Sequence, residues 1–390
     1  MPKAYIKMRE KVMIEIREVK TKKDVRLFAT YPLKLYKNCP YYVPSLRDDE
    51  MNTFNPKKNF SLKHSIIKGF LAYKNGELVG RIAGFISLPS NEMRKEKYIR
   101  FSRLECIDDI EVFKALIGAV EKFGREQGME NIHGPWGFND QDREGMLTWG
   151  FDKRSTYATN YYYPYFSENM KKLGFNDESL WVEKEFAIKS YDRITDISEK
   201  LKKKHNVREL LDTLSIKQII KNYGGKIYTA LNDAYGHLDN YVPVDDLTWK
   251  NLLKSFAIII NPKYCSFLVD EKDDIVAFGV CFPSIANALI KNKGKILPFG
   301  FIDLLKSINK PKELEMAIIG VTHTHKNTGI NAIVISRIMN NVVKDKIQRI
   351  ESNPMLESNS NILNQWKFAE TEIIKKRQTY VKPIGSLITE

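Results

Sequence analysis

Two tight hairpins at corresponding places in the two halves of the chain constrain the fold more than any other feature. In the first half, apolar runs at 68–73 and 78–84 flank residues 74–77, whose Asn75-Gly76 pair is typical of a two-residue β-turn. In the second half, runs at 264–269 and 275–282 flank the acidic turn 271–274. Each hairpin is followed by a strand pattern and an amphipathic helix pattern. Both halves are therefore expected to combine an antiparallel sheet with helices.

The other elements repeat in the same order. The first half has these expected elements: a strand at 13–19, a helix at 22–36, a strand at 99–106, a helix from 112 that ends at Gly128, a strand at 131–134, a helix at 165–174 and a strand at 180–188. In the second half, residues 226–228 and a helix near 231–235 precede a helix at 244–257. After the hairpin come a strand at 313–321, a helix at 330–343, a strand at 349–351, a helix near 360–366 and a strand at 372–380. This predicts a tandem α+β duplication, with domains 1–190 and 191–390 and a junction near 191–204, where charge density rises.

Composition narrows the function classes. The formal charge of +14 is spread over many lysines and no recognised nucleic-acid motif accompanies it, so we do not expect a nucleic-acid partner. The apolar runs are strand-sized and residues 1–17 lack a signal-peptide core, so we expect a cytoplasmic protein without a membrane partner. The four cysteines stand far apart, without a CxxC pair or a neighbouring histidine, so no metal site is expected.

The segment His325–Ala332 lies between an apolar strand pattern and a long helix pattern. A strand, a small-residue turn that carries cations and then a helix can present free backbone amides to a diphosphate, and the helix dipole favours the anion. Gly329 would let backbone and phosphate approach closely. An acyl-CoA transferase is the leading interpretation.

The order of strands and helices, with the strand, turn and helix around His325–Ala332 at its centre, resembles the GNAT superfamily of acyl-CoA N-acyltransferases. The signature of that superfamily is Gln/Arg-x-x-Gly-x-Gly/Ala. In residues 326–331 Gly329 matches, Lys326 keeps the charge, and Asn331 replaces a small residue. The segments 134–138, 150–152, 353–359 and 375–380 resemble those of a poorly characterised bacterial group of tandem GNAT-like proteins.

The resemblance implies two tandem domains, each a mixed, mainly antiparallel sheet with splayed central strands flanked by helices. Acetyl-CoA or another acyl-CoA would be the cosubstrate, with its pantetheine arm in the gap between the strands. The implied CoA-binding residues are Val321, His323, Lys326, Asn327, Thr328, Gly329, Ile330 and Asn331. The corresponding segment of the first half is 105–111, which contains no glycine and as many as four carboxylates. Asp108 or Asp109 would cap the helix there, so no CoA is expected in the first domain.

The expected reaction is acyl transfer to a small-molecule or peptide amine, which needs a base and an acid. Glu315 resembles in position the carboxylate that the family often uses as base, and His323 is a second candidate. The usual tyrosine acid is missing, because the aligned position is Leu363; Tyr380 or a water could substitute.

Candidate acceptor residues are Trp136, Asp140 and Asp142 in the first half and Glu357 and Asn359 after the fifth strand of the second. Solvated loops and helix caps are the alternative interpretations of these residues. Two further functions stay open at this point. One is a non-catalytic protein that binds CoA or another ligand at decayed sites. The other is a Fem-like transferase that uses aminoacyl-tRNA on twin GNAT-like domains.

Overall fold

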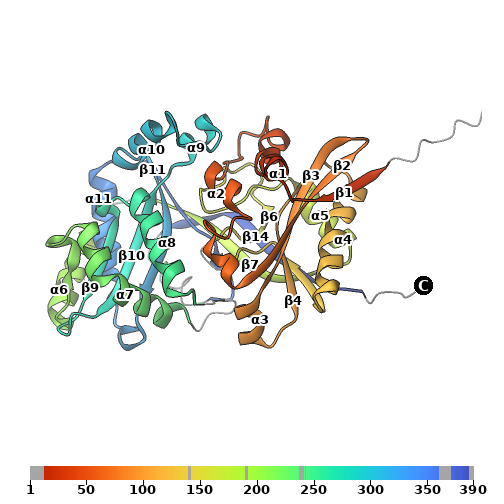
Figure 1. Ribbon diagram of the computed structural model, residues 1–390. Coiled ribbons are helices and arrows are strands. Elements are labelled where there is room, and N and C mark those ends of the chain that lie inside the picture. The colour runs from red at the N-terminus through yellow and green to blue at the C-terminus, as the bar shows by residue number, and fades with distance from the viewer. Residues whose placement is uncertain are drawn as a thin grey trace, which may run out of the picture.

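The computed structural model describes residues 13–138, 142–188, 192–236, 241, 243–359 and 370–385, with the side chains of residues 192 and 193 excepted. Two α+β halves lie side by side and share one mixed, mainly antiparallel sheet of 14 strands (Figure 1). Helices cover both faces of this sheet. The predicted fold class is confirmed.

The first half follows the predicted order and adds short helices. Its elements are β1 (Ile14–Glu18), α1 (Lys22–Leu35), α2 (Arg47–Asn52), η1 (Phe60–Lys63), β2 (Ser65–Lys74), β3 (Glu77–Ser87), α3 (Leu88–Arg94), β4 (Tyr98–Cys106), α4 (Ile110–Glu126), β5 (Asn131–Gly134), β6 (Met146–Trp149), α5 (Pro164–Lys172) and β7 (Asn176–Phe186). The first hairpin is confirmed. Asn75 and Gly76 both have positive φ, 51° and 81°, as the tight turn between β2 and β3 requires.

The second half has more helix than the sequence indicated. Its elements are α6 (Asp192–His205), β8 (Arg208–Glu209), η2 (Leu210–Asp212), α7 (Ile216–Tyr235), α8 (Asp246–Ile259), η3 (Pro262–Tyr264), β9 (Cys265–Val269), β10 (Ile275–Pro283), α9 (Ala286–Asn292), α10 (Gly300–Asn309), β11 (Glu313–Val321), η4 (His323–His325), α11 (Asn331–Lys344), β12 (Arg349–Ser352), β13 (Met355–Leu356) and β14 (Thr371–Pro383). The helix predicted near 360–366 lies outside the described residues.

Two segments of this half are more helical than the sequence indicated. Residues 226–228 belong to the continuous helix α7, which passes through Gly224 without a break, and the indole Nε1 of Trp249 on α8 donates to the Gly224 carbonyl at 2.9 Å. The close approach of α8 thus compensates for the low helix propensity of glycine. The supposed junction 191–204 is mostly α6, which packs against α11. Its lysines lie in the last turn, where cations favour the helix dipole.

Each half has a core on both faces of its sheet. In β2, Phe70 and Ala72 pack under α4, whereas the intervening Leu71 packs with Phe28 of α1. In the second half α11 covers one face, with Ile333 and the residues around it, and α7 and α8 cover the other.

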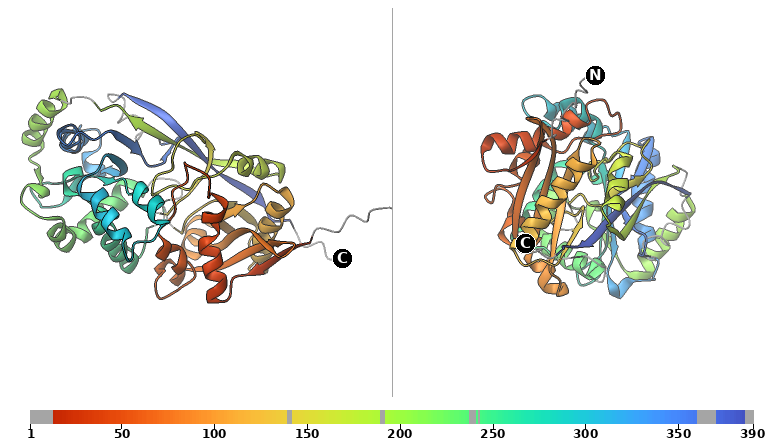
Figure 2. Two further views of the ribbon diagram at one scale, coloured as in Figure 1. Left: turned by 90° about the horizontal axis from the view of Figure 1, so that it is seen from above. Right: turned by 90° about the vertical axis from the view of Figure 1, so that its right-hand side faces the viewer.

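The halves exchange their last strands. Along the sheet the order is β1-β2-β3-β4-β5-β14-β7-β12-β11-β10-β9-β8, with β6 beside β14 and β13 beside β7. β14 from the end of the chain therefore pairs with β5 of the first half, and β7 of the first half pairs with β12 of the second. Figure 2 shows β7 and β14 crossing together from one half to the other. Backbone pairing thus runs across the predicted domain boundary at residue 190.

Candidate functional site

The central parallel strands of the second half separate partway along their length. β11 pairs with β12 from Glu313 to Met316, and the Asn353 amide still donates to the Met316 carbonyl at 3.0 Å. On its other edge β11 pairs with β10, but Ala317 is skipped between Met316 and Ile318, which is a β-bulge. Because a bulge bends and twists its strand, β11 turns away from β12 beyond this point. The predicted splay is therefore present, and the bulge is its cause.

The first half has the same device. β4 pairs in parallel with β5 over three residues, and the pairing of β4 with β3 skips a position beside Arg103, whose φ is +53°. Both halves therefore have a bulge and a parallel pair at the same point of their order, as a duplication implies.

A cavity of about 530 Å³ lies between the halves and reaches the separated strands β11 and β12. Its volume is in the range of small-molecule sites. One wall is apolar and comes from α7, α8, β10, β11 and α11; it includes Ile219, Ile227, Leu231, Leu252, Phe256, Phe278, Val280, Ile318, Ile338 and Met339. The opposite wall is charged and comes from α2, β3, β4 and the following loops; it includes Asp49, Glu50, Arg81, Arg103, Asp142, Arg143 and Glu144. Figure 1 shows α2 and α8 facing each other across the middle of the molecule.

Glu50 organises the charged wall. Its carboxylate contacts the Arg81 guanidinium at 2.7 Å and Arg103 Nε at 3.1 Å. Arg81 also binds Glu105 and the carbonyl of Phe28. Burial alone would raise the pKa of Glu50, but the guanidinium groups of Arg103 and Arg81 lower that pKa to about 2. These charges neutralise one another and hold α2 against the sheet.

Asp49, the neighbour of Glu50, lines the cavity and lacks such a pairing in the ion pairs described. Asp49 is exposed to the space of the cavity; partial desolvation there, and then the charge of Glu50, raise the pKa of Asp49 to about 6. Among the described residues, the Nη2 atom of Arg143 and the Oδ1 atom of Asn353 are buried without a hydrogen-bond partner. The Arg143 guanidinium lies 5.7 Å from the ring centroid of Tyr157. The cavity thus presents a basic carboxylate, a cation and an amide oxygen to a ligand.

Glu315 lies close to this cavity but does not line it. Its carboxylate accepts the Ser284 hydroxyl at 2.8 Å and the Tyr157 amide at 3.1 Å. It borders a small polar hollow of about 10 Å³ with Arg154 and Glu351. Burial raises the pKa of Glu315. Glu315 therefore holds in place the loop of Tyr157, which does line the large cavity.

The predicted diphosphate turn follows β11. Residues 323–325 form η4, Asn327 has a φ of +65° and Gly329 one of +81°, and the Thr328 hydroxyl donates to the His325 carbonyl at 2.7 Å. No side chain caps α11 at Ile330. In contrast, Asp109 caps α4 of the first half by accepting the amides of Glu111 and Val112.

This contrast confirms the predicted carboxylate cap in the first half. In the second half, Val321, Lys326 and Asn331 lie along the same stretch, from the end of β11 through the turn to the start of α11. The amide of His323 is occupied, because it donates to the Asp233 carboxylate at 2.5 Å.

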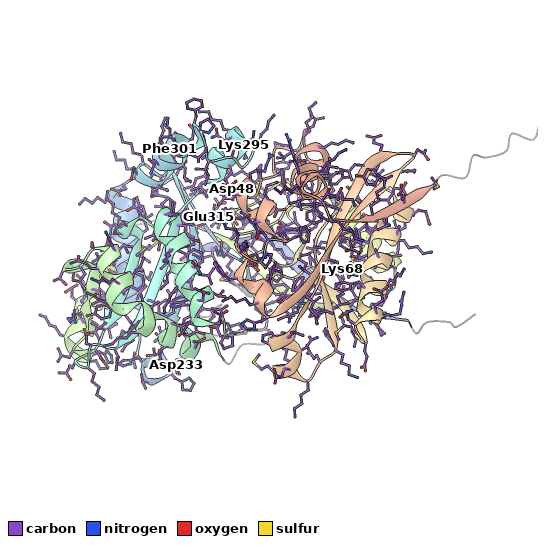
Figure 3. All side chains as sticks on the ribbon, in the orientation of Figure 1. Asp48, Lys68, Asp233, Lys295, Phe301 and Glu315 are labelled. Atoms are coloured by element: carbon purple, nitrogen blue, oxygen red, sulfur yellow. The ribbon has the colours of Figure 1, made fainter. Side chains whose placement is uncertain are left out.

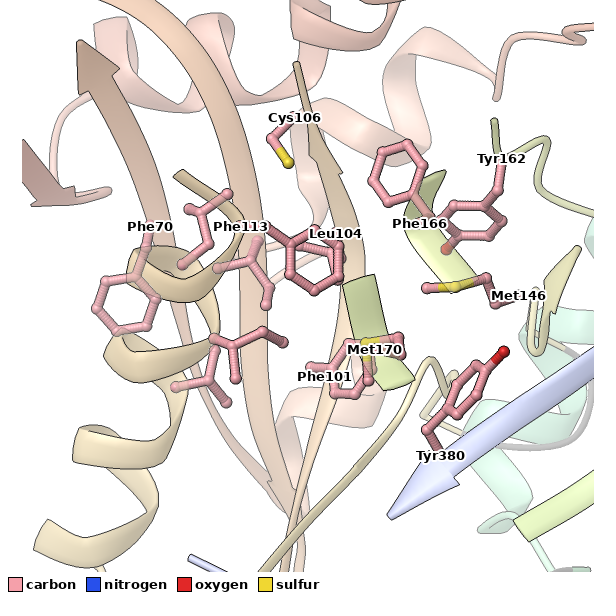
Figure 4. Close-up of a cluster of buried hydrophobic side chains, with 14 of the residues drawn as sticks. Phe70, Phe101, Leu104, Cys106, Phe113, Met146, Tyr162, Phe166, Met170 and Tyr380 are labelled. Atoms are coloured by element: carbon pink, nitrogen blue, oxygen red, sulfur yellow. The ribbon is translucent and has the colours of Figure 1, made fainter. Parts of the chain in front are cut away.

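Tyr380 lies elsewhere. It is fully buried in the core of the first half beside Met146 and Met170 (Figure 4), and its hydroxyl has no hydrogen-bond partner among the described residues. Burial raises the pKa of Tyr380. The structure therefore does not bring Glu315, His323 and Tyr380 together at one place.

Of the candidate acceptor residues, Trp136, Asp142 and Asn359 line the large cavity. The Asp142 carboxylate accepts the Phe138 amide at 2.7 Å. Glu357 is exposed and is not among the residues that line the cavity. Asp140 lies outside the described residues.

Sequence reasoning missed Asp49 and the role of Asn353. Asp49 lies in the acidic run 48–50, which reads as an exposed helix start, and no motif marks it. Asn353 lies in a segment that resembles the tandem group, and this signal could have identified it. Within the described parts of the chain, no cluster of three or more metal-ligating side chains occurs, and no helix is long and apolar enough to cross a bilayer.

The fold is a tandem GNAT-like fold. The chain superposes, with a TM-score of 0.56 and 9% identity, on a tandem GNAT protein from the clavulanic acid biosynthesis pathway, covering 96% of this chain and 99% of that one. It also matches a GCN5-related N-acetyltransferase from Sphaerobacter thermophilus, with a TM-score of 0.51, 9% identity and 96% of both chains covered.

Two named bacterial proteins are similar to the chain in sequence. Protein YghO of Escherichia coli (strain K12) is 23% identical over 381 residues, which cover 95% of each chain. The bacterial ceramide synthase of Caulobacter vibrioides (strain NA1000 / CB15N) is 27% identical over 312 residues, which cover 78% of this chain and 79% of that one. No protein-family model matches the chain.

Proposed function

We propose that this protein is an N-acyltransferase that moves a long acyl group from acyl-CoA to the amine of an amphiphilic acceptor. The observation that carries the proposal is the cavity of about 530 Å³, which has an apolar wall and a charged wall and reaches the separated strands β11 and β12. An acyl chain or lipid tail fits the apolar wall, and a polar head with an amine fits the charged wall.

The comparisons support the substrate class. The tandem GNAT-like fold is shared with named N-acetyltransferases, and one sequence relative is named a ceramide synthase. A ceramide is the amide of a fatty acid with a long-chain amino alcohol, so its synthesis requires an apolar tail and an amine in one site. The apolar wall of the present cavity fits an apolar tail better than it fits an acetyl group and a small polar amine.

The turn 326–331 fits an acyl-CoA diphosphate. The start of α11 carries no side-chain cap, Gly329 has the positive φ of a close-approach turn, and Lys326 supplies a positive charge. Ile319 lines the cavity and precedes His323 by four residues, which corresponds to about 13 Å of extended chain. The Tyr235 hydroxyl now donates to the Ile319 carbonyl at 2.8 Å and would give way to an arm that bonds this backbone.

Asp49 is the proposed base. A carboxylate with a pKa near 6 is ionised at neutral pH, so it attracts the acceptor ammonium and accepts its proton. The amine nitrogen then forms the C–N bond as the C–S bond of the thioester breaks, and the thiolate takes up a proton from water. Asn353 Oδ1, at the end of β12, is placed to hold an N–H group of the acceptor. Glu315 acts indirectly, by positioning Tyr157.

The test is an acyl-transfer assay on the purified protein. Acetyl-, octanoyl- and palmitoyl-CoA are each combined with a long-chain 2-amino-1,3-diol or with a short amino alcohol. Thiol release and the mass of the amide product are measured. We expect palmitoyl-CoA with the long-chain amine to be the fastest pair.

A bulky residue in the cavity provides the matched control. Ser255→Trp on α8 projects into the cavity and should lower kcat/KM for palmitoyl-CoA at least tenfold. Lys250→Trp, on the same helix but not on the cavity wall, should leave it unchanged. Equal rates with acetyl-CoA and a short amine would contradict the long-chain proposal. Binding of acyl-CoA without thiol release would favour the non-catalytic alternative. The separate positions of Glu315, His323 and Tyr380 also support that alternative.

A further inference from the structure

The hairpin formed by α9 and α10 exposes an unusual amount of apolar surface. Leu297 and Phe299 are 72% and 73% exposed, more than any other large apolar side chain described. Together with Ile290, Phe301, Ile302 and Leu305 they form what is called here the apolar patch. Apolar side chains gathered on one surface mark interaction sites in soluble proteins.

The apolar patch is not needed to hold the hairpin in place. The opposite side of α10 buries Leu304 and Ile308, which pack against Ile259 and Leu289. Asp303 binds Lys291 and Asn292, each at 2.8 Å, and so ties α10 to α9. α10 is therefore apolar on two sides, and only the inner side serves the fold.

The hairpin is also fixed to the first half of the molecule. The Arg47 amide, at the start of α2, donates to the Gly294 carbonyl at 2.7 Å, and the Arg47 guanidinium donates to the Lys293 carbonyl at 3.1 Å. The hairpin that carries the apolar patch is therefore held by hydrogen bonds to the first half, beside α2, which lines the cavity.

Exposed lysines are interspersed along the chain with the residues of the apolar patch. Residues 286–312 contain six lysines, at 291, 293, 295, 306, 310 and 312, and all six are exposed. Asp303 is the only acidic residue in that range, and Lys291 pairs with it. Figure 3 shows Phe301 and Lys295 at the same end of the molecule, both directed outward. Exposed phenylalanine and leucine next to lysine are the combination that binds the surface of an anionic bilayer.

We propose that the apolar patch and its lysines dock the protein on the surface of a membrane that contains anionic lipids. The aromatic and aliphatic side chains enter the boundary between headgroups and acyl chains, and the lysines contact the headgroup phosphates. Such docking requires no spanning segment. It therefore differs from the expectation of no membrane partner, which rested on the absence of spanning and signal-peptide segments in the sequence.

The position of the apolar patch gives docking a consequence for the cavity. Phe256 and Phe282 pack into the cluster beneath α10 and also line the cavity, as does Leu46, which precedes α2. A docked protein therefore holds its cavity close to the bilayer, where an amphiphilic acceptor could enter without crossing bulk water. This consequence rests on the proposed function, whereas the docking itself does not.

The test measures cosedimentation with vesicles in the absence of acyl-CoA and amine. The full chain is mixed with phosphatidylcholine vesicles or with vesicles that contain 30% phosphatidylglycerol. We expect wild type to pellet with the anionic vesicles and to be released by high salt. The variants Leu297→Ser/Phe299→Ser and Lys293→Glu/Lys295→Glu should each lower the partition coefficient at least tenfold.

The matched control is Leu88→Ser/Met93→Ser, which removes two exposed apolar side chains from α3, at the bottom of Figure 1, whereas α9 and α10 lie at its top. It should bind vesicles as wild type does. Failure of wild type to pellet at low salt, or unchanged binding of the Leu297→Ser/Phe299→Ser variant, would overturn the proposal.

A second result would also overturn the proposal. Sedimentation velocity could show that wild type is a dimer that does not bind vesicles and that the Leu297→Ser/Phe299→Ser variant is a monomer, because the apolar patch would then join two copies. Acyl transfer to a detergent-dispersed amine tests the proposed function separately, so the two failures can be told apart.

Discussion

Asp49 and Glu50 are adjacent in the sequence, yet their environments shift their pKa values in opposite directions. Two guanidinium groups outweigh the burial of Glu50, whereas Asp49 faces the cavity and is affected most by desolvation. One residue is therefore structural and its neighbour is available for chemistry. A carboxylate with a raised pKa in a cleft is a functional candidate on physical grounds.

Asp49→Asn is the prediction at this scale. If Asp49 is the base, kcat/KM of wild type rises with pH through about 6, as the carboxylate ionises. The variant should lose about 100-fold or more at pH 7.5. Asp48→Asn, on the exposed neighbour that does not line the cavity, is the control (Figure 3). An unchanged rate in the Asp49 variant would remove Asp49 from the mechanism.

The same substitution should stabilise the fold. A carboxyl group whose pKa is higher in the folded than in the unfolded chain makes folding less favourable as pH rises from about 4 to 6. Asparagine does not ionise and so does not lose folding stability between about pH 4 and 6. The difference in Tm between the variant and wild type should therefore grow from about pH 4 to 6 and stay constant above about pH 6. Thermal unfolding at pH 4.5, 5.5 and 7 measures it, and a gain that shrinks with pH would contradict the raised pKa.

At the scale of elements, the exchanged strands β7 and β14 are joined by buried charges. The Lys375 ammonium on β14 contacts Glu183 on β7 at 2.8 Å and also Glu351 on β12. Arg377 binds Glu183 as well, and all of these side chains are almost fully buried. Burial raises the pKa of Glu351 to about 7, although Lys375 opposes this shift. Lys375 therefore connects strands from both halves.

Lys375→Met removes the cation that Glu183 and Glu351 share. Arg377 and Arg349 each still contact one of these carboxylates. Removal of one partner of a buried ion pair costs about 3–5 kcal/mol. We expect the free energy of unfolding, measured in urea, to fall by this amount. Lys376→Met on the same strand is the control and should change stability by less than about 1 kcal/mol. Equal effects of the two substitutions would show that the buried pairs contribute no specific stability.

The start of α11 provides a prediction about acyl-CoA. Gly329 has a φ of +81°, which asparagine and aspartate tolerate better than most residues, and a Cβ there would have space. Gly329→Asn therefore tests the backbone alone, and Gly329→Asp adds a charge. Repulsion of about 1–2 kcal/mol should weaken acetyl-CoA binding about tenfold more in the Asp variant. Calorimetric titration measures both, and equal affinities would place the diphosphate elsewhere.

At the scale of the whole molecule, the cavity and the strand exchange make the halves depend on each other. Without β14, β5 of the first half would keep β4 alone as a neighbour, and without β7, β12 would keep β11 alone. Unpaired strand edges of this kind promote aggregation. The predicted domains 1–190 and 191–390 are joined by backbone pairing into one sheet.

Fragments 1–190 and 191–390 should therefore aggregate when expressed alone and form a soluble complex when coexpressed. The complex should show the circular dichroism spectrum of the intact chain. Two fragments that are separately monomeric, soluble and cooperatively folded would contradict the role assigned to β7 and β14.

The sequence alone determined the elements that depend on local patterns. The Asn75-Gly76 turn, β11 and the aspartate cap of α4 follow from neighbouring residues, because turn geometry, period-2 alternation and capping act over a few positions. The long-range pairing of β14 with β5 could not be predicted in this way. The strands lie more than 200 residues apart, and both read as ordinary strands.

Only the tertiary structure decided which charged residues face a cavity. Glu315 and Asp49 are both carboxylates with raised pKa values, but hydrogen bonds from Ser284 and Tyr157 occupy the first, and the second faces the hollow. That difference is created by segments that come from both halves of the chain. A local sequence pattern cannot predict these contacts, because the environment of a side chain depends on the segments that the fold places beside it.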